Sequence, residues 1–204
     1  MTTAGEGGML TTNDPGIWNL AWSYKDHGKS YQAVYERNHS PGFRWLHESF
    51  GTNGRMTEVQ AAVGRVQLRK LSAWTANRRR HAAILNACVS KLPALRAAMP
   101  AAEIGHAYYK FYCYVRPERL RPNWSRDLIM SAITNEGVPC FSGTCSEIYL
   151  EKAFPESMRP PERLQVAREL GETSLMFMVH PTITDEDMRD TCRAVEKVMT
   201  KATQ

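Results

Sequence analysis

The longest regular pattern of hydrophobic and polar positions runs from Thr57 to about Leu92, where the chain has no proline and one glycine. At about 100° per residue its apolar side chains fall within one stripe roughly 100° wide, which predicts a single amphipathic helix. The stripe holds Val59, Val63, Val66, Trp74, Ile84, Leu85, Cys88 and Leu92. Such a helix would be about 50 Å long, so we expect it to bridge two separately folded bodies.

The residues before this helix predict a short strand and a second helix. A Gly-rich segment, Thr2–Gly8, leads into a β-like stretch at Met9–Thr12. Asp14-Pro15 is a favoured helix start, and Gly28 stands where a C′ glycine would end the helix. The face expected to be apolar holds Ile17, Leu20, Ala21 and Tyr24. Neighbouring segments offer the strand no sheet partner, so we expect the chain to begin inside a larger domain.

Periodicity disappears between Lys29 and Gly54, where aromatic residues are frequent instead. They are Tyr31, Tyr35, Phe43, Trp45 and Phe50. Linkers avoid aromatic residues, so a stretch of this length and composition favours a functional loop.

Strands and helices alternate after Pro93, which predicts a compact α/β layer of about a hundred residues. The expected strands are Tyr108–Arg116, Val138–Phe141 (a short strand or turn) and Ser174–Val179. The expected helices are Ser125–Glu136, with Ser125 as cap, Glu162–Leu170 and Thr184–Lys201, where Thr184 and Asp187 resemble a capping box.

Composition excludes several classes of protein. With 43% hydrophobic and 23% charged residues, the chain of 204 residues is not expected to be disordered. It lacks an uninterrupted apolar run of about 18 to 20 residues, so we expect no membrane span. Met1–Leu10 has neither the basic nor the apolar region of a secretory signal, which makes the cytoplasm the expected compartment.

The five cysteines are an odd number and form no CxxC motif, which favours reduced, buried thiols over a disulfide framework or a zinc site. Cys140 and Cys145 are spaced as CxxxxC, but too few further ligands lie nearby, so no metal is expected there.

Positive charge is concentrated in one segment: from Val59 to Ala102 there are eight Lys or Arg residues and no acid. Within the long helix, Arg65, Arg69, Arg79 and Arg80 fall opposite the apolar stripe, as a solvated face would. A nucleic-acid reader would normally add aromatic platforms or a known module, so no nucleic-acid partner is expected.

Five segments, in this order, resemble the DegT/DnrJ/StrS family of aminotransferases. They are TTAGEGGMLTTND (2–14), KDHG (25–28), NGRMTEVQAAVGRVQLRKL (53–71), HAYYKFYCYV (106–115) and VHPTITD (179–185). Members of the family are fold-type I, pyridoxal-phosphate-dependent enzymes that act mostly on nucleotide-linked keto-sugars. The resemblance implies a remnant of the large domain at 1–56, the bridging helix at 57–92 and the complete small α/β domain at 93–204.

The resemblance also implies that the reactive lysine and two further cofactor-binding residues are missing. In the family, the lysine that holds the cofactor as a Schiff base lies a few residues before the TTAGEGG-like segment, and here Met1 stands just after that place. The carboxylate for the pyridine nitrogen and the serine for the phosphate also lie upstream in the family. None of the eight lysines present is in a comparable setting, so these 204 residues alone are expected to be catalytically silent.

Asn53 and Arg55 in GTNGRM are the strongest site candidates. By resemblance, Asn53 would reach the cofactor phosphate of the partner subunit in a homodimer, and Arg55 would lie toward the anionic end of the substrate. Amide and guanidinium donors just ahead of a helix suit phosphate oxygens. The residues alone favour a turn residue or cap at Asn53 and a solvated charge at Arg55, and the resemblance reverses that preference.

Two further residues are kept as substrate contacts because of the resemblance. Ser142 lies in a loop that borders the substrate in the family, although a Ser-Gly turn explains it equally well. His180 ends a predicted strand that faces the family's active-site cleft, although it also suits the edge of a core. Glu6 and His27 are given structural roles: a surface turn and a helix C-terminus.

The resemblance therefore implies the C-terminal part of an aminotransferase that transfers an amino group from glutamate or glutamine to a nucleotide-linked keto-sugar, with pyridoxal phosphate as cofactor. Two alternatives stay open. One is a non-catalytic chain that pairs with a separate partner or an intact homologue, and the other is a basic helical scaffold that binds nucleic acid.

Overall fold

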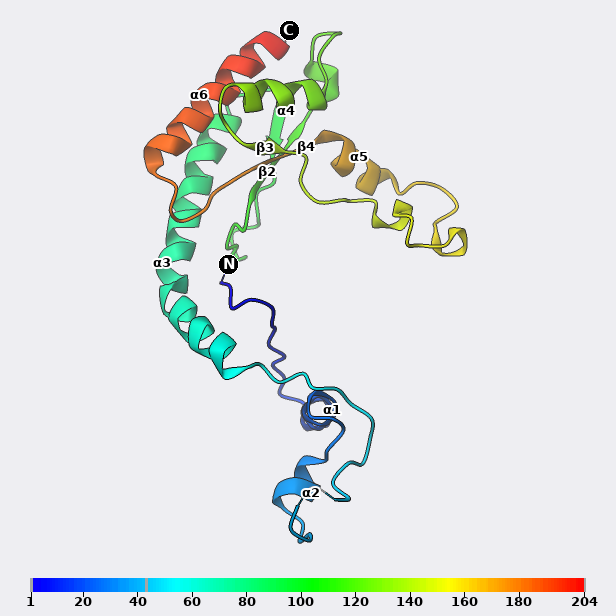
Figure 1. Ribbon diagram of the computed structural model, residues 1–204. Helices are drawn as coiled ribbons and strands as arrows, with labels where there is room; N and C mark the ends of the chain where they lie inside the picture. Colours follow the sequence, from blue (N-terminus) through cyan, green and yellow to red (C-terminus); the bar gives the residue numbers. More distant parts are fainter. Residues whose placement is uncertain (1, 43, 204) are drawn as a thin grey trace. The chain divides into compact units, whose positions relative to one another are not determined.

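The computed structural model describes residues 2–42 and 44–203. The chain forms two compact units, and the boundary between them falls within one long helix (Figure 1). This helix, α3 (Glu58–Val89), has 32 residues, which confirms the predicted long helix. The first unit comprises Thr2–Leu71, and the second begins at Ser72. The helix ends before Leu92 because Pro93 disfavours helical backbone at the preceding residue. The division of the chain at residues 56 and 92 stays a prediction.

In the first unit, helix α1 (Pro15–Lys25) begins as predicted. The Asp14 carboxylate accepts hydrogen bonds from the backbone N–H groups of Gly16 (2.7 Å) and Ile17 (3.1 Å). At the other end, both His27 (φ 63°) and Gly28 (φ 87°) are left-handed, and Gly28 donates to the carbonyl of Ser23 at 2.8 Å. Gly28 is thus the second residue beyond the cap and not the C′ residue that was predicted.

The strand predicted at Met9–Thr12 is wrong, because these residues form no regular structure. A strand needs a neighbour for its backbone groups, and no described segment pairs with this one. Met9 and Leu10 are accordingly exposed.

The aromatic stretch 29–54 is less irregular than predicted, since it contains the short helix α2 (Tyr31–Tyr35), capped by Ser30. Tyr31 packs edge-on against Trp18 and Trp22, with ring centroids 5.1 and 5.2 Å apart. Phe43, one of the aromatic residues counted in this stretch, lies outside the described residues, as does Met1.

The second unit is built on a four-stranded antiparallel sheet in the order β1-β2-β4-β3. Its strands are β1 (Leu95–Ala97), β2 (Phe111–Val115), β3 (Cys140–Phe141) and β4 (Ser174–Phe177). The strands predicted around β2, β3 and β4 are confirmed with shorter bounds. Strand β1 was not predicted, because three residues are too few to show an alternating pattern.

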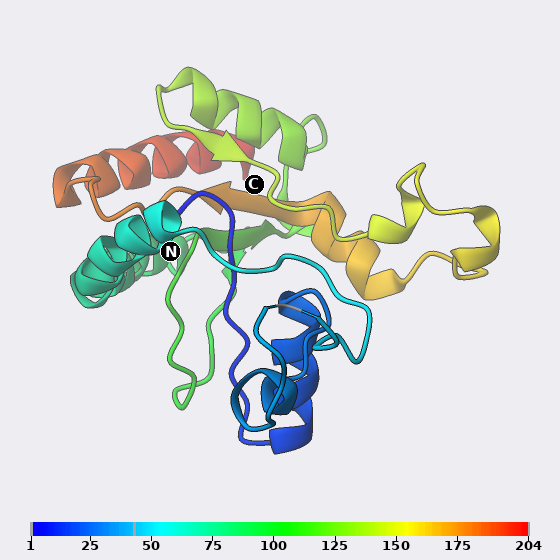
Figure 2. The same cartoon turned by 60° about the horizontal axis from the view of Figure 1, so that its bottom comes forward.

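One face of this sheet forms the core of the second unit. Phe111 and Cys113 lie opposite Phe177 and Leu175, so all four side chains point to the same side. That side is covered by the C-terminal half of α3 and by helices α4 (Arg126–Asn135) and α6 (Asp185–Ala202), and α4 and α6 lie side by side (Figure 2). The other face carries Arg96, Tyr112 and Tyr114.

Helix caps place α4 and α6 as predicted, whereas α5 begins later than expected. Ser125 caps α4, and Thr184 with Asp187 forms the complete capping box of α6. Helix α5 (Gln165–Thr173) begins three residues after the predicted Glu162, because Arg163 and the backbone of Leu164 are engaged by Glu147 and Tyr149. Three short 3₁₀ helices complete the unit: η1 (Pro117–Arg119), η2 (Ile148–Leu150) and η3 (Glu156–Met158).

All five cysteines are free thiols. Cys88, Cys113 and Cys140 are buried as predicted, but Cys145 is exposed, which corrects the expectation of uniformly buried thiols. None of the helices in the described part of the chain combines the length and the apolar character that crossing a membrane requires.

Leu175 tests the packing of the sheet on its helices. It is fully buried on β4 opposite Cys113, so we expect Leu175→Ala to lower the free energy of unfolding of this unit by about 2–5 kcal/mol. The matched control is Leu128→Ala on α4, where the side chain is 44% exposed and the expected cost is below about 1 kcal/mol. Urea denaturation followed by circular dichroism measures both. Equal costs would contradict the packing described here.

Candidate functional site

The segment that carries Asn53 and Arg55 is held by backbone hydrogen bonds to the end of α1. Thr52 donates to the carbonyl of Tyr24 at 2.7 Å, and Gly54 donates to that of Lys25 at 2.8 Å. In return, His27 donates to the carbonyl of Thr52 at 3.1 Å. The last carbonyls of a helix have no partner inside it, and here the site segment supplies one.

Two glycines allow this close approach. A Cβ atom on Gly28 would collide with the carbonyl group of Ser49, and its φ of 87° would be strained in any other residue. A Cβ atom on Gly51 would collide with the backbone of Gly28 and Tyr24. The backbone of residues 49–54 can therefore lie directly on the end of α1 only because both positions lack a side chain.

Asn53, Arg55 and Asp26 form a small polar cluster in the first unit. The Oδ1 atom of Asn53 accepts from the backbone N–H and the Nε–H of Arg55, at 3.4 and 3.3 Å. The Nη1 atom of Arg55 lies 3.3 Å from Oδ1 of Asp26, and Lys29 lies 3.8 Å from the same atom. The structure thus brings together the two site residues predicted in this segment.

The cluster leaves hydrogen-bond donors available for an anion. Within the described part of the chain, the Nδ2 group of Asn53 donates no hydrogen bond, and the Arg55 side chain is half exposed. An amide and a guanidinium held two residues apart are suited to phosphate or carboxylate oxygens. The Asp26 carboxylate offsets part of the positive charge and fixes the direction of the guanidinium.

The sequence analysis did not identify Asp26 as part of the site, although its position at the end of a helix indicates a cationic partner. An acidic residue at the C-terminal end of a helix is unfavourable to the helix dipole unless a cation compensates it. Asp26 is the C-cap residue of α1, and its side chain is only 12% exposed. An acid in such a place indicates a cationic partner, which the structure identifies as Lys29 and Arg55.

Ser142 lies in the second unit, in the loop that follows β3. Its carbonyl accepts from the hydroxyl of Ser174 at 2.5 Å, which ties the loop to the start of β4. The residue borders a hollow of about 780 Å³ whose other walls include Arg126, Thr144 and Glu147. A substrate contact by Ser142 stays a prediction.

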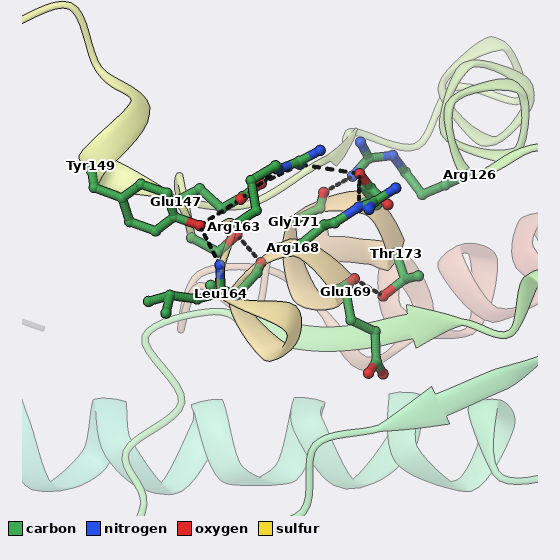
Figure 3. A network of polar contacts seen from close by, with 12 residues as sticks. Arg126, Glu147, Tyr149, Arg163, Leu164, Arg168, Glu169, Gly171 and Thr173 are labelled. Carbon is green, nitrogen blue, oxygen red and sulfur yellow. Dashed lines mark hydrogen bonds and ion pairs between the residues drawn. The ribbon is translucent and has the colours of Figure 1, made fainter. Parts of the chain in front are cut away.

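A network of charged side chains fixes the far end of this loop (Figure 3). The buried carboxylate of Glu147 accepts from Arg163 at 2.9 and 2.5 Å and from the Tyr149 hydroxyl at 2.7 Å. These hydrogen bonds from Arg163 and Tyr149 lower the pKa of Glu147 to about 2. Arg126 donates to the carbonyls of Gly171 (3.1 Å) and Ser174 (3.0 Å). The hollow beside Ser142 therefore has fixed walls.

His180 lies beyond the other end of β4, and its side chain is exposed. Its Nδ1 atom lies 2.7 Å from the hydroxyl of Thr182. Partial desolvation, with the nearby positive charge of Arg78, lowers the pKa of His180, which favours the neutral imidazole. His180 borders a separate hollow of about 760 Å³ beside α6.

The structure does not bring Ser142 and His180 together. Ser142 is tied to Ser174 at the start of β4, whereas His180 lies three residues beyond the end of that strand. They border different hollows, so a small molecule bound in either hollow would contact only one of them.

Arg78 is a buried cation that the sequence analysis did not single out. It is 5% exposed, and its Nη1 group donates to the carbonyls of Tyr108 (3.3 Å) and Tyr109 (2.9 Å). The sequence could have indicated its burial, because Arg78 shares one helix face with Trp74, His81 and Leu85. Arg79 and Arg80, in contrast, are exposed as predicted.

The chain belongs to the DegT/DnrJ/EryC1/StrS aminotransferase family, whose profile matches residues 1–196. This confirms the resemblance seen in the sequence motifs. The solved aminotransferase from Psychrobacter cryohalolentis is 51% identical and superposes with a TM-score of 0.86, over 93% of this chain and 50% of that one. That superposition also supports the α/β fold class.

Two curated relatives match at lower identity. The "Erythromycin biosynthesis sensory transduction protein EryC1" of Saccharopolyspora erythraea is 26% identical, over 89% of this chain and 44% of that protein. The dTDP-3-amino-3,4,6-trideoxy-α-D-glucose transaminase of Streptomyces venezuelae is 25% identical, over 87% of this chain and 41% of that protein. The chain thus spans about half the length, or slightly less, of the relatives it matches.

Gly28→Ala tests the attachment of the site segment to α1. The added methyl group would strain the left-handed backbone and collide with the carbonyl of Ser49, so we expect residues 49–55 to detach and to exchange their amide hydrogens at least tenfold faster. The control is Gly8→Ala, where no atom lies within 4 Å of the new Cβ. Hydrogen exchange followed by mass spectrometry measures both variants. Unchanged exchange in Gly28→Ala would contradict the attachment described here.

His180 gives a prediction for pH. Its pKa is lowered on folding, so the unfolded chain binds more protons below its ordinary pKa of about 6.5, and the stability of the fold decreases as pH falls through that value. Proton NMR of the imidazole should show a midpoint below 6.5 in the folded chain, and Arg78→Met should move it upward. A midpoint at or above the value measured in urea would refute this. His180→Gln should reduce the loss of stability below pH 6.5.

Proposed function

We propose that this chain forms the C-terminal part of a pyridoxal-phosphate-dependent aminotransferase that transfers an amino group from glutamate or glutamine to a nucleotide-linked keto-sugar. The observation that carries the proposal is the pair Asn53 and Arg55, held on the end of α1 in a chain whose family match covers residues 1–196. The name of the Streptomyces venezuelae relative, a dTDP-sugar transaminase, supports the substrate class.

The residues present fit the phosphate end of the cofactor. The Nδ2 group of Asn53 remains available as a donor while its Oδ1 is occupied by Arg55, and a neutral amide donor suits a phosphate oxygen. When bound, pyridoxal phosphate supplies the electron sink that allows an amino group to be transferred. This chain would contribute Asn53 to the phosphate, across the interface of a homodimer.

The remaining residues would act on the substrate. Arg55, held in direction by Asp26, would pair with an anionic group of the nucleotide-sugar. Ser142 and His180 would contact the substrate at separate points, because they border different hollows. A neutral His180 would offer a hydrogen bond without adding a charge. The cytoplasm stays the expected compartment.

Exposed apolar side chains favour a second candidate, a non-catalytic chain that pairs with a partner. On α1 the exposed fractions are 74% for Leu20, 63% for Tyr24 and 48% for Ile17. Exposed apolar residues that share one helix face indicate an interaction surface. An aminotransferase assembled from this chain would need the same face covered, so catalysis distinguishes the two candidates.

A fusion tests the proposed function. The N-terminal half of the Psychrobacter cryohalolentis aminotransferase, placed before residues 1–204, should give transaminase activity with a nucleotide-linked keto-sugar, whereas residues 1–204 alone should give none and no borohydride-trappable link to pyridoxal phosphate. In the fusion, Arg55→Ala should weaken nucleotide-sugar binding about ten- to a hundredfold, since it removes a charge-assisted contact. Asn53→Ala should weaken cofactor binding instead.

Matched controls make the result specific. Arg65→Ala and Asn123→Ala change exposed residues of the same types elsewhere, and both should leave the two dissociation constants unchanged. Isothermal titration gives the constants, and thermal melting shows whether each variant is folded. If Asn53→Ala and Arg55→Ala behave like their controls, the proposed roles of these residues are refuted. An active fusion would still exclude the non-catalytic candidate.

A further inference from the structure

Two cysteines from opposite ends of the second unit meet where α3 contacts α6. Cys88 lies in the last turn of α3, and Cys192 lies in the second turn of α6, 104 residues later in the chain. Neither residue borders the hollows beside Ser142 and His180. The pair is therefore independent of the proposed catalytic function.

The contacts between the two residues are reciprocal. The Sγ atom of Cys88 lies 3.9 Å from the backbone carbonyl oxygen of Cys192. The Sγ atom of Cys192 lies 3.9 Å from the carbonyl oxygen of Ile84, one helical turn before Cys88. The sulfur of Cys88 thus lies against the backbone of Cys192, and the sulfur of Cys192 lies against the backbone of α3 one turn before Cys88. Side chains at i and i+4 share a helix face, so both thiols lie in the same contact.

The surroundings of the two thiols differ in a way that favours stepwise oxidation. Cys88 is 6% exposed, whereas Cys192 is partly exposed and can be reached by a small reagent. Hydrogen bonding to Cys88 lowers the pKa of Cys192, while hydrogen bonding to Cys192 and burial raise the pKa of Cys88. Burial and the negative charge of Glu196 raise the pKa of Cys192 and offset part of this effect, whereas Lys91 lowers that pKa. The more accessible thiol is also the one whose pKa is lowered, which suits an initial oxidation site.

We propose that Cys88 and Cys192 are a redox modification site, at which a peroxide forms a reversible disulfide that links α3 to α6. Hydrogen peroxide transfers one oxygen atom to the sulfur of Cys192, which becomes a sulfenic acid, and water is released. The thiol of Cys88 then attacks that sulfur, the S–S bond forms, and the oxygen leaves as a second water. Two thiols are oxidised and one peroxide is reduced to two waters. A dithiol reductant reverses the modification.

The disulfide would close a loop that contains most of the second unit. Such a link restricts the unfolded chain more strongly when the loop is long. Because α3 and α6 both contribute to the core of this unit, linking them should raise its thermal stability. The modification would thus report an oxidising environment as a change in stability, and it does not depend on cofactor or substrate.

The experiment uses the chain with Cys145→Ser, which removes the exposed thiol that could link two molecules. Hydrogen peroxide at neutral pH should reduce the four remaining thiols to two and give one peptide pair joined through Cys88 and Cys192, seen by mass spectrometry without reductant. The melting temperature of the second unit should rise. Dithiothreitol should restore both the thiol count and the original melting temperature.

Cys88→Ser and Cys192→Ser are the matched controls, since each replaces sulfur by oxygen at one of the two positions. Neither should give the joined peptides or the rise in melting temperature. Because reversal by dithiothreitol is measured with both cysteines present, the test does not depend on how well these variants fold. The proposal is overturned if Cys192 is oxidised to sulfinic acid while Cys88 stays a thiol, or if the joined peptide pair contains Cys113 or Cys140.

Discussion

Helix α1 ends in backbone carbonyls that no residue of the helix can satisfy, and the position of the candidate site depends on how the chain satisfies them. Thr52 and Gly54 donate to the carbonyls of Tyr24 and Lys25, which places Asn53 between two anchored residues. The same hydrogen bonds end the helix and hold the site segment. A side chain at position 28 or 51 would collide with the neighbouring backbone. It would therefore disturb both the end of the helix and the site segment.

Charged side chains at the end of α1 orient the donors of the candidate site. Asp26 stands at the negative end of α1, where an acid is unfavourable by itself, and it interacts with Lys29 and Arg55. These interactions compensate the helix end and fix the direction of the Arg55 guanidinium. Arg55 in turn donates to Oδ1 of Asn53, which leaves the amide N–H groups for an anion. The donors of the cluster are thus oriented by contacts within this unit.

In the second unit, the packed core and the candidate contact residues lie in different places. One sheet face is buried under α3, α4 and α6, while the candidate contacts Ser142 and His180 lie beyond opposite ends of β4. The loop at Ser142 is fixed by hydrogen bonds to Ser174 and by the ion pair of Glu147 with Arg163. The two candidate residues are therefore held at separate places of this unit, and each borders a different hollow.

The sequence by itself determined the long helix, the caps at Asp14, Ser125 and Thr184, the buried strand β4 and the family, because periodicity and capping are local and the motifs are specific. It also indicated Asn53 and Arg55. Only the tertiary structure decided that Met9–Thr12 forms no strand, since a strand depends on a distant partner. Tertiary contacts also moved the start of α5 to Gln165 by engaging Arg163, and they paired Asp26 with Arg55 and Cys88 with Cys192. Each of these outcomes rests on residues that are distant in sequence or on a competition for hydrogen bonds, which no local pattern records.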